Sequence, residues 1–288
     1  MTISLRTAAT RARAPVAEVG RKATPARLAR IMRSAATQFG ALGYTLAGLT
    51  LAAAVWSAIV ATGQFPRALF PSVLDILGAG QTLYGDGLLI ADIAASLRRA
   101  AAGFILGAIT GISAGMLTAN TKAGRSLLQP VLRLLAPIPT IGLIPLAILW
   151  FGLGESSKTL VIALGVFVPV WINSHAGLVS TPQDYLQAAR CLGAGRIQTL
   201  TRVILPEAAP DMASGLRVGA AMAFVLIVVA EMTGTTSGIG YRIYQAQLFS
   251  QADRLIFCLI VLGIIGALCD IAIAAATRPA TRWASEEH

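Results

Sequence analysis

Residues 255–276 read LIFCLIVLGIIGALCDIAIAAA, a stretch in which Asp270 is the only charged side chain. A helix of about 20 apolar residues crosses the hydrocarbon core of a bilayer, so this stretch is long enough to span a membrane. A soluble protein of similar size can bury one core, but it cannot hide several separate stretches of this kind. The stretch therefore predicts a transmembrane helix near the end of the chain.

Working outward from this helix, the sequence contains five more apolar stretches of similar length. Hydrophobic residues make up 56% of the 288 residues and charged residues only 12%, against roughly a quarter charged in an ordinary soluble domain. Backbone groups in lipid must be satisfied within their own segment, so each span is expected to be a helix. The predicted fold class is an all-α integral membrane protein with six transmembrane helices. The spans are predicted near residues 40–63, 100–119, 131–152, 159–180, 213–234 and 255–276. Between the first two, Pro71-Ser72 is predicted to open a short surface helix that Gly78 and Gly80 end.

The third stretch is interrupted by Pro137, Pro139 and Pro145. Proline removes a backbone donor, and membrane helices tolerate it where neighbouring groups satisfy the freed carbonyls. In transporters, broken helices commonly line a cavity. The three prolines are therefore candidates for a translocation path, with an ordinary helix kink as the alternative.

Basic residues indicate the orientation, because Lys and Arg in short loops stay on the cytoplasmic side. Residues 1–39 form a basic tail in which eight Lys or Arg accompany one acid, Glu18. With this tail inside, nine more basic residues lie in inner loops and six lie outside. Both termini are therefore expected in the cytoplasm, and residues 40–288 form the transmembrane domain. The net charge of +10 then matches anionic lipid, so lipid rather than nucleic acid is the expected partner.

The longest inner loop, residues 181–212, begins with the pattern of a short helix. Thr181-Pro182-Gln183-Asp184 offers a cap hydroxyl, a proline at the first helical position and an acid in the first turn. Apolar side chains then recur at helical spacing on one face. They are Tyr185, Ala188, Ala189 and Leu192.

A second short helix is predicted after Gly193-Ala194-Gly195, which interrupts the first. Its apolar face begins at Ile197, and Pro206 is expected to stop it. An exposed apolar surface usually marks a protein contact. The alternative is that the pair lies back on its own spans. A DNA-binding role is disfavoured, because few arginines are present and no side chains suited to reading bases cluster on one helix.

These residues resemble the coupling loop of binding-protein-dependent ABC importer permeases. That loop reads Glu-Ala-Ala, then Gly four residues after the second Ala, then an aliphatic stretch that ends in Pro. Here the matching residues are Gln187-Ala188-Ala189, Gly193 and Val203-Ile204-Leu205-Pro206. The likeness runs from about Pro71 to Trp283. Residues 134–145 (LLAPIPTIGLIP), 150–154 (WFGLG), 215–217 (GLR) and 230–233 (AEMT) resemble the nitrate, sulfonate and taurine group of these permeases.

The resemblance implies a type I ABC importer permease fold with a cytoplasmic coupling helix, in the bacterial inner membrane. It implies a second copy of the permease as a homodimer partner, and a periplasmic or lipid-anchored substrate-binding protein. Separate ABC ATPase subunits would hold ATP and Mg²⁺, so this chain is expected to bind no cofactor and to carry no catalytic residue. The implied solute is a small anion such as a sulfonate, taurine or nitrate.

The resemblance also carries over the residues expected to contact the ATPase. They are Asp184, Tyr185, Gln187, Ala188, Ala189, Arg190, Gly193, Leu205 and Pro206. Gln187 stands where the family has an acid, and an amide can hydrogen-bond but cannot form an ion pair. Gly193 is expected to give a tight turn.

Acids close to the hydrocarbon are candidates for function, because a charge there is costly. Glu231 matches the acid of the family's Ala-Glu-Met stretch and is a candidate for the translocation path. The alternative is a structural ion pair with an outer base such as Arg99 or Arg242. Asp270 is expected to reach the headgroup region. Arg98 and Arg99 are weaker candidates for attracting an anion.

Two other classes of protein remain as alternatives. A stand-alone secondary transporter or channel would have no use for an apolar docking loop, and it more often carries several intramembrane charges. A membrane enzyme would show convergent catalytic groups at one depth. His175 has no second histidine or cysteine pair near it in the sequence, so no metal site is predicted.

Overall fold

The computed structural model describes residues 43–44, 47–64 and 66–281, and the chain divides into two units, residues 1–59 and 60–288. Helix Ala47–Ala61 lies mostly in the first unit, and the other helices belong to the second. Every regular element in these described ranges is a helix, which confirms the all-α prediction there.

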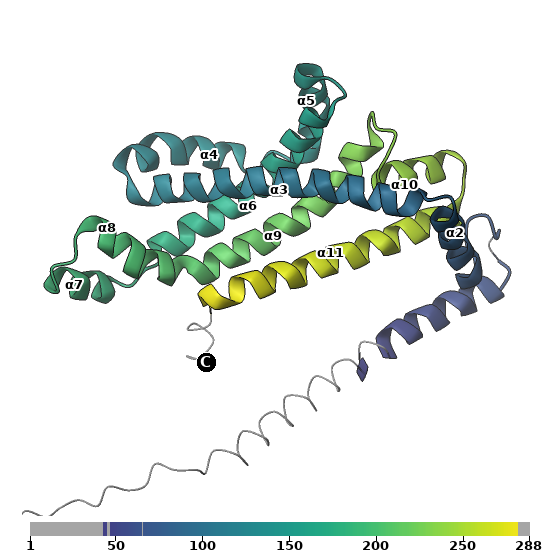
Figure 1. Cartoon of the computed structure of the whole chain (residues 1–288), viewed down its shortest axis with the longest axis horizontal. Helices are drawn as coiled ribbons and strands as arrows, with labels where there is room; N and C mark the ends of the chain where they lie inside the picture. Colours follow the sequence, from purple (N-terminus) through teal and green to yellow (C-terminus); the bar gives the residue numbers. More distant parts are fainter. Residues whose placement is uncertain (1–42, 45–46, 65, 282–288) are drawn as a thin grey trace, which may run out of the picture. The chain divides into compact units, whose positions relative to one another are not determined.

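Four helical segments of the second unit have the length and composition of membrane spans (Figure 1). They are α3 (Leu88–Asn120), α6 (Glu155–Val179), Arg196–Met232 and α11 (Ala252–Thr281). The segment Arg196–Met232 contains α8 (Arg196–Thr199), a π-helical turn and α9 (Leu205–Met232). The remaining helices are α2 (Val73–Gly85), α4 (Gln129–Leu135), α5 (Ile144–Phe151), α7 (Gln183–Cys191) and α10 (Ile239–Leu248).

The most extensive helix contact joins α3 to α6, and small residues make it possible. Four glycines recur at every fourth position on the face of α3 that meets α6; they are Gly103, Gly107, Gly111 and Gly115. A β-carbon at Gly107 would lie 2.5 Å from the backbone oxygen of Ala163, and one at Gly111 would lie 2.9 Å from that of Phe167. Because these positions carry no side chain, the two backbones touch, as small residues allow between membrane helices.

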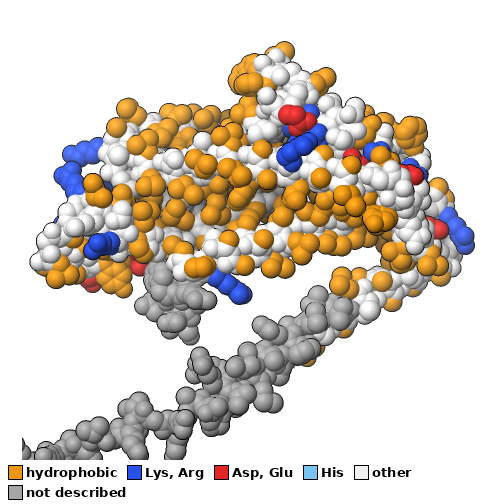
Figure 2. Space-filling view, viewed as in Figure 1, with side chains coloured by type: hydrophobic (Ala, Val, Ile, Leu, Met, Phe, Trp, Pro, Cys, Tyr) orange, Lys and Arg blue, Asp and Glu red, His pale blue; other side chains and the backbone are white. Residues whose placement is uncertain are grey.

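The other side of α6 packs against α9, so α6 forms the centre of the second unit. The shared core contains Val161, Ile162, Val166 and Val170 of α6 with Ala223, Leu226 and Ile227 of α9. α11 packs on α9 and α10, yet Cys258 is its only buried residue. Figure 2 shows hydrophobic side chains over the long sides of these helices and most charged side chains near their ends. This surface is that of a protein solvated by lipid rather than by water.

The six-span prediction is not fully reached in the described ranges. The predicted third span is a pair of helical segments, Gly124–Leu135 and Thr140–Phe151, bent by 91° into a broken span or a re-entrant loop. The predicted first span lies partly outside the described residues. Its described part, Ala47–Ala61, is about 22 Å long at 1.5 Å per residue, which is shorter than a hydrocarbon core of about 30 Å.

Two helix boundaries differ from the predictions for physical reasons. α3 begins at Leu88 rather than near residue 100, because Asp92, Ser96 and Arg99 all lie on its inward face and find polar partners there. α2 continues through Gly78 and Gly80, which the sequence predicts as its end. Gly80 lies against the ring of Phe257, where a β-carbon would not fit. Its role is close packing rather than termination.

The start of α2 agrees with the prediction of a surface helix that opens at Pro71-Ser72. The Ser72 hydroxyl accepts a hydrogen bond from the Asp75 N–H at 3.2 Å, and the Asp75 carboxylate accepts one from the Ser72 N–H at 2.9 Å. This reciprocal cap satisfies two orphan donors of the first turn. Hydrogen bonds from the hydroxyl and the backbone of Ser72 hold the pKa of Asp75 below its usual range.

The glycine contact predicts a sharp sensitivity to side-chain size at Gly107. Gly107→Val should lower the stability of the purified protein by about 2–3 kcal/mol, because the added atoms meet backbone that cannot move aside. Ala102→Val is the matched control, since Ala102 is on the same helix but exposed. The two variants are compared by their melting temperatures in detergent. Equal melting temperatures for the two variants would show that the packing of α3 on α6 does not depend on close backbone contact at Gly107.

Candidate functional site

The loop between α6 and α9 holds the residues predicted for a protein contact. α7 ends at Cys191 as the pattern predicts, and the chain reverses through Gly193, whose φ is +75°. The N–H groups of Gly193 and Ala194 donate back to Arg190 and Ala189, which caps the helix. A side chain at a φ of this sign is strained, so glycine suits this turn.

The start of α7 corrects one detail of the sequence prediction. Pro182 occupies the cap position rather than the first helical position, and no side-chain hydrogen bond caps the helix. The hydroxyl of Thr181 is buried without a hydrogen-bond partner among the described residues, so it does not act as the predicted cap. The helix begins with Gln183 instead.

The predicted contact residues divide between an outer and an inner face. Ala189 is buried, and Leu205 is partly buried in a cluster with Ala119, Leu178 and Ala208 at the ends of three spans. The others are exposed, namely Asp184, Tyr185, Gln187, Ala188, Arg190, Gly193 and Pro206. Leu192 and Ile197, at the tip of the loop, are 88% and 78% exposed. The loop is therefore anchored at its base and presents apolar side chains at its tip.

Pro206 does not stop the second helix, contrary to the prediction. The helical segment runs without a break from Arg196 to Met232. A π-helical turn, Leu200–Ile204, ends with only Leu205 between it and the proline, and the Leu205 N–H donates to the Leu200 carbonyl five residues earlier. Proline normally clashes with the carbonyl four residues before it, and the wider turn relieves this clash. The tip of the loop is thus joined to a membrane span by continuous helix.

The predicted path prolines lie around the bend of the broken span. Pro139 caps a 3₁₀ turn, Thr140–Leu143, and Pro145 sits in the first turn of α5. Pro137 lies in the segment between α4 and this turn. Their neighbours Ala136, Ile138 and Thr140 help line an apolar cavity of about 520 Å³ against α3 and α6. The broken backbone therefore borders a cavity, which is the geometry that such breaks serve in transporters.

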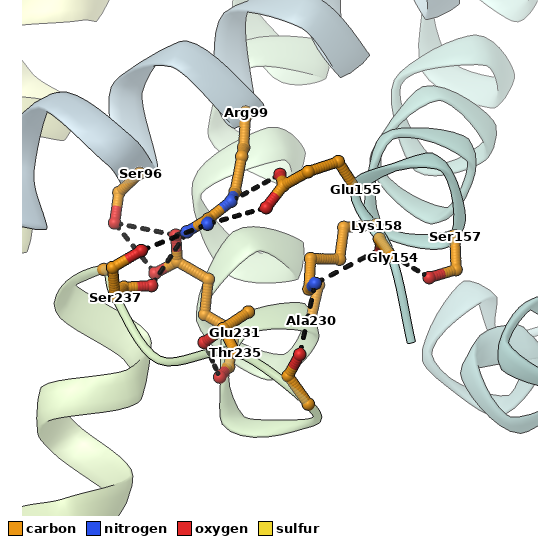
Figure 3. A network of polar contacts seen from close by, with 12 residues as sticks. Ser96, Arg99, Gly154, Glu155, Ser157, Lys158, Ala230, Glu231, Thr235 and Ser237 are labelled. Carbon is orange, nitrogen blue, oxygen red and sulfur yellow. Dashed lines mark hydrogen bonds and ion pairs between the residues drawn. The ribbon is translucent and has the colours of Figure 1, made fainter. Parts of the chain in front are cut away.

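Glu231 lies at the opposite end of α9 from the loop, and its side chain is fully buried. Arg99 of α3 donates from Nη1 to its carboxylate at 2.8 Å, and the Ser96 hydroxyl donates to it at 2.8 Å (Figure 3). The N–H of Gly240 supplies a further bond at 2.9 Å. The sequence left two roles open for Glu231, a place on the translocation path or a structural ion pair. The structure has the ion pair, with Arg99. The cavity at the proline break is not lined by Glu231.

Arg99 joins three helices through one guanidinium group (Figure 3). Its Nε and Nη2 donate to the Glu155 carboxylate at the start of α6, at 2.6 and 2.8 Å. Its Nη1 also reaches the carbonyl of Ser237 in the turn after α9, at 2.8 Å. These donors are all taken, so Arg99 does not offer the free cation that would attract an anion. Arg98, its exposed neighbour, takes no part in this network.

Two further buried charged residues, Asp92 and Lys158, complete the polar cluster. Asp92 accepts hydrogen bonds from the Gly238 N–H and from Arg242 of α10. Lys158 is buried, and its ammonium group donates to the carbonyls of Leu153, Gly154 and Gly234. The cluster is electrically balanced, because three acids (Asp92, Glu155, Glu231) accompany three bases (Arg99, Lys158, Arg242). Its geometry holds the turn after α9 against α3 and α6.

Apart from the pair of Glu231 with Arg99, which the sequence offered as an alternative, the sequence predictions missed this cluster, although one signal was available. Asp92, Ser96 and Arg99 fall on the same helical face as Gly103 and the later glycines, so the inward face of α3 is continuous from polar to small residues. Two other polar contacts lie elsewhere. Arg217 and Asp270 form a bidentate pair between α9 and α11 at 2.8 Å, and His175 contacts Thr118 and Gln129.

Several apolar spans, one of them continuous with an exposed loop, define a multi-pass membrane protein. Residues 93–279 match the family described as "Binding-protein-dependent transport system inner membrane component". The chain belongs to this family. It is therefore the permease component of an ABC transporter, which confirms the resemblance, and the stand-alone transporter is not favoured.

Named relatives support the same assignment. The chain is 34% identical to the "Taurine transport system permease protein TauC" of Escherichia coli over 77% of this chain and 80% of that one. It is 35% identical to the "Putative aliphatic sulfonates transport permease protein SsuC" of Bacillus subtilis, over 80% and 83%. The fold is similar to that of the MetNI methionine ABC transporter in inward-facing conformations. That match has a TM-score of 0.56 at 21% identity and covers 67% of this chain and 96% of the other.

The cluster predicts that loss of Arg99 is costly. Arg99→Gln leaves the buried carboxylate of Glu231 without its cation, which should destabilise the protein by about 3–5 kcal/mol. Adding Glu231→Gln removes the orphan charge and should recover part of this loss. Arg98→Gln is the matched control and should change little, because Arg98 is exposed. Melting temperatures in detergent measure all three, and a loss at Arg99 no larger than at Arg98 would contradict the ion pair.

Proposed function

We propose that this permease forms the membrane path of an ATP-driven importer for a small sulfonate such as taurine or an alkanesulfonate. The observation that carries the proposal is the likeness to the taurine and aliphatic sulfonate permeases over more than three quarters of the chain. Nitrate, which the group resemblance also allows, remains the alternative solute. A substrate-binding protein outside the membrane would select the solute and deliver it.

In this proposal, ATP is hydrolysed by partner subunits that dock on the loop between α6 and α9. The exposed side chains of Leu192 and Ile197 support this, because apolar tips of this kind are buried in a protein contact. The basic tail of residues 1–39 supports a cytoplasmic location for the termini and for this loop. ATP and Mg²⁺ would be held by the partner ATPases, and two copies of the permease would enclose the path.

Gln187 fits such a docking surface without an ion pair. It is exposed on α7, and its amide has no hydrogen-bond partner among the residues that the structure describes. It can therefore donate to and accept from a partner, although it lacks the charge of an acid. Asp184 and Arg190, exposed on the same helix, supply charges of both signs beside it.

The continuous helix from Arg196 to Met232 supports a mechanical role for the loop. A displacement at Ile197 is transmitted along helical backbone rather than absorbed at a break, because the π-helical turn keeps the segment connected through Pro206. The same helix ends at Met232, directly after Glu231 of the polar cluster. Movement of docked ATPases would thus reach the turn after α9 through one rigid element.

Reconstituted vesicles test the proposed function directly. Permease, ATPase and binding protein together should accumulate labelled taurine or alkanesulfonate only when ATP is present, and the permease alone should move neither. A shift in the melting temperature of the binding protein identifies the solute independently. Solute movement by the permease alone would overturn the ATP-driven assignment, and a binding protein that responds only to nitrate would overturn the sulfonate.

The turn at Gly193 gives a sharper test of the loop. Gly193→Val forces a branched side chain into a left-handed conformation and should leave the protein in the membrane while lowering ATP-dependent uptake at least tenfold. Gly195→Val is the matched control, since Gly195 lies two residues away with an ordinary φ of −70°. Uptake and ATPase binding are measured for both. Normal uptake with Gly193→Val would contradict the role of this turn.

A further inference from the structure

A second cavity, with a partly polar lining, lies at the end of the bundle opposite the α7–α8 loop. It has a volume of about 350 Å³ and is formed where the ends of α2 and α10 meet the first turns of α3 and α11. Its lining residues are Leu83, Leu88, Arg242, Gln245, Ala246, Phe249, Gln251, Arg254 and Cys258. A bulk water occupies about 30 Å³, so the cavity has room for a small polyatomic group with several waters.

The rim of this cavity is a strained turn. Ser250 has φ of +54° and is the only residue other than glycine with a positive φ in the described part of the chain. The N–H groups of Phe249 and Gln251 donate back to Gln245 and Ala246 at 3.1 and 2.8 Å, which closes the end of α10. Such strain is retained where the surrounding structure requires it. Here the turn places Phe249 and Gln251 beside the cavity.

The cavity contains more hydrogen-bond donors than acceptors. Arg242 uses Nε for Asp92 and Nη1 for the side-chain oxygen of Gln245, which leaves its Nη2 without a partner among the described residues. The guanidinium of Arg254 is only partly exposed and likewise has no hydrogen bond or ion pair within the described ranges. A partly buried guanidinium without an acceptor is costly, so this arrangement favours a ligand that accepts hydrogen bonds.

The charges around the cavity give the sign of that ligand. Asp92 neutralises Arg242, and no acid lines the cavity to neutralise Arg254. Asp86 and Asp253, the acids nearest in sequence to the lining, are not part of it. The site therefore carries one net positive charge beside apolar walls from Leu83, Leu88 and Phe249.

We infer that this cavity binds a tetrahedral oxoanion, a phosphate or sulfonate group, held by Arg254, Gln251 and the free amino group of Arg242. A guanidinium fork matches such a group through paired charge-assisted hydrogen bonds. The anion is not the phosphate of a nucleotide on a docked ATPase, because the cavity lies at the other end of the spans. Two sources of this chemistry exist, the headgroup of an anionic phospholipid and a free sulfonate. The inference stands independently of ATP-driven uptake.

Ligand-induced shifts in melting temperature test the site on the full-length protein in a non-ionic detergent. The probes are phosphatidylglycerol, phosphatidylcholine and methanesulfonate, with sodium chloride as the control for ionic strength. The variants are Arg254→Gln, Arg254→Lys to retain the charge, and Arg98→Gln as a matched loss of an arginine that does not line the cavity. Because the test measures ligand binding, its result does not depend on whether the protein transports a solute.

The wild type should be stabilised by phosphatidylglycerol or by methanesulfonate beyond the effect of sodium chloride. Arg254→Gln should raise the half-saturating concentration about tenfold, as expected for one lost charge-assisted hydrogen bond. Arg254→Lys should recover much of the binding, and Arg98→Gln should bind like the wild type.

The probe that responds identifies the source of the anion. A response to phosphatidylglycerol but not to methanesulfonate assigns the site to lipid, and the reverse assigns it to a solute. Equal responses to phosphatidylglycerol and phosphatidylcholine, or an equal loss in Arg254→Gln and Arg98→Gln, would overturn the inference. So would the absence of any response above sodium chloride in the wild type.

Discussion

The packing of α3 on α6 through four glycines is the contact on which the rest of the second unit depends. Between helices in lipid there is no hydrophobic driving force, so association depends on close van der Waals packing and on polar bonds. Gly103 to Gly115 provide the first of these, because β-carbons at their positions would meet α6 directly. Once α6 is held in this way, its other face carries α9, and α9 carries α11. The sequence of packing contacts, from α3 to α6, from α6 to α9 and from α9 to α11, thus begins with the close approach of α3 to α6.

The polar bonds lie on the same face of α3, about one to three turns before the first glycine, Gly103. Arg99 connects Glu155 of α6 to Glu231 of α9, and Asp92 and Ser96 bind the turn before α10. A buried ion pair does not by itself stabilise a protein, but its geometry favours one arrangement over others. In this permease the cluster determines where the turn after α9 lies, while the glycines determine how closely the helices approach.

Hydropathy alone was sufficient to locate the long spans, and the loop motif identified the family, because both are local patterns. The sequence offered the pair of Glu231 with Arg99 only as one alternative, and the pairing of Arg99 with Glu155 was not predicted, because these partners lie 132 and 56 positions away in the sequence. Pro206 was predicted as a helix end because the usual rule for proline assumes α-helical geometry, which the preceding π-helical turn avoids. Gly80 was misread for a related reason, since glycine serves packing as well as termination. The inward face of α3, by contrast, was present in the sequence as a regular spacing.

The π-helical turn at Leu200–Ile204 also fixes a rotation. A π turn holds one residue more than an α-helical turn, and each residue of an α-helix advances about 100° around its axis. The helical residues before the turn are therefore rotated about the helix axis relative to the span that follows it. A similar turn, Gly124–Leu128, precedes Pro130 in the other connection near this end. The direction in which the loop faces is thus encoded by one extra residue in a helix rather than by the loop itself.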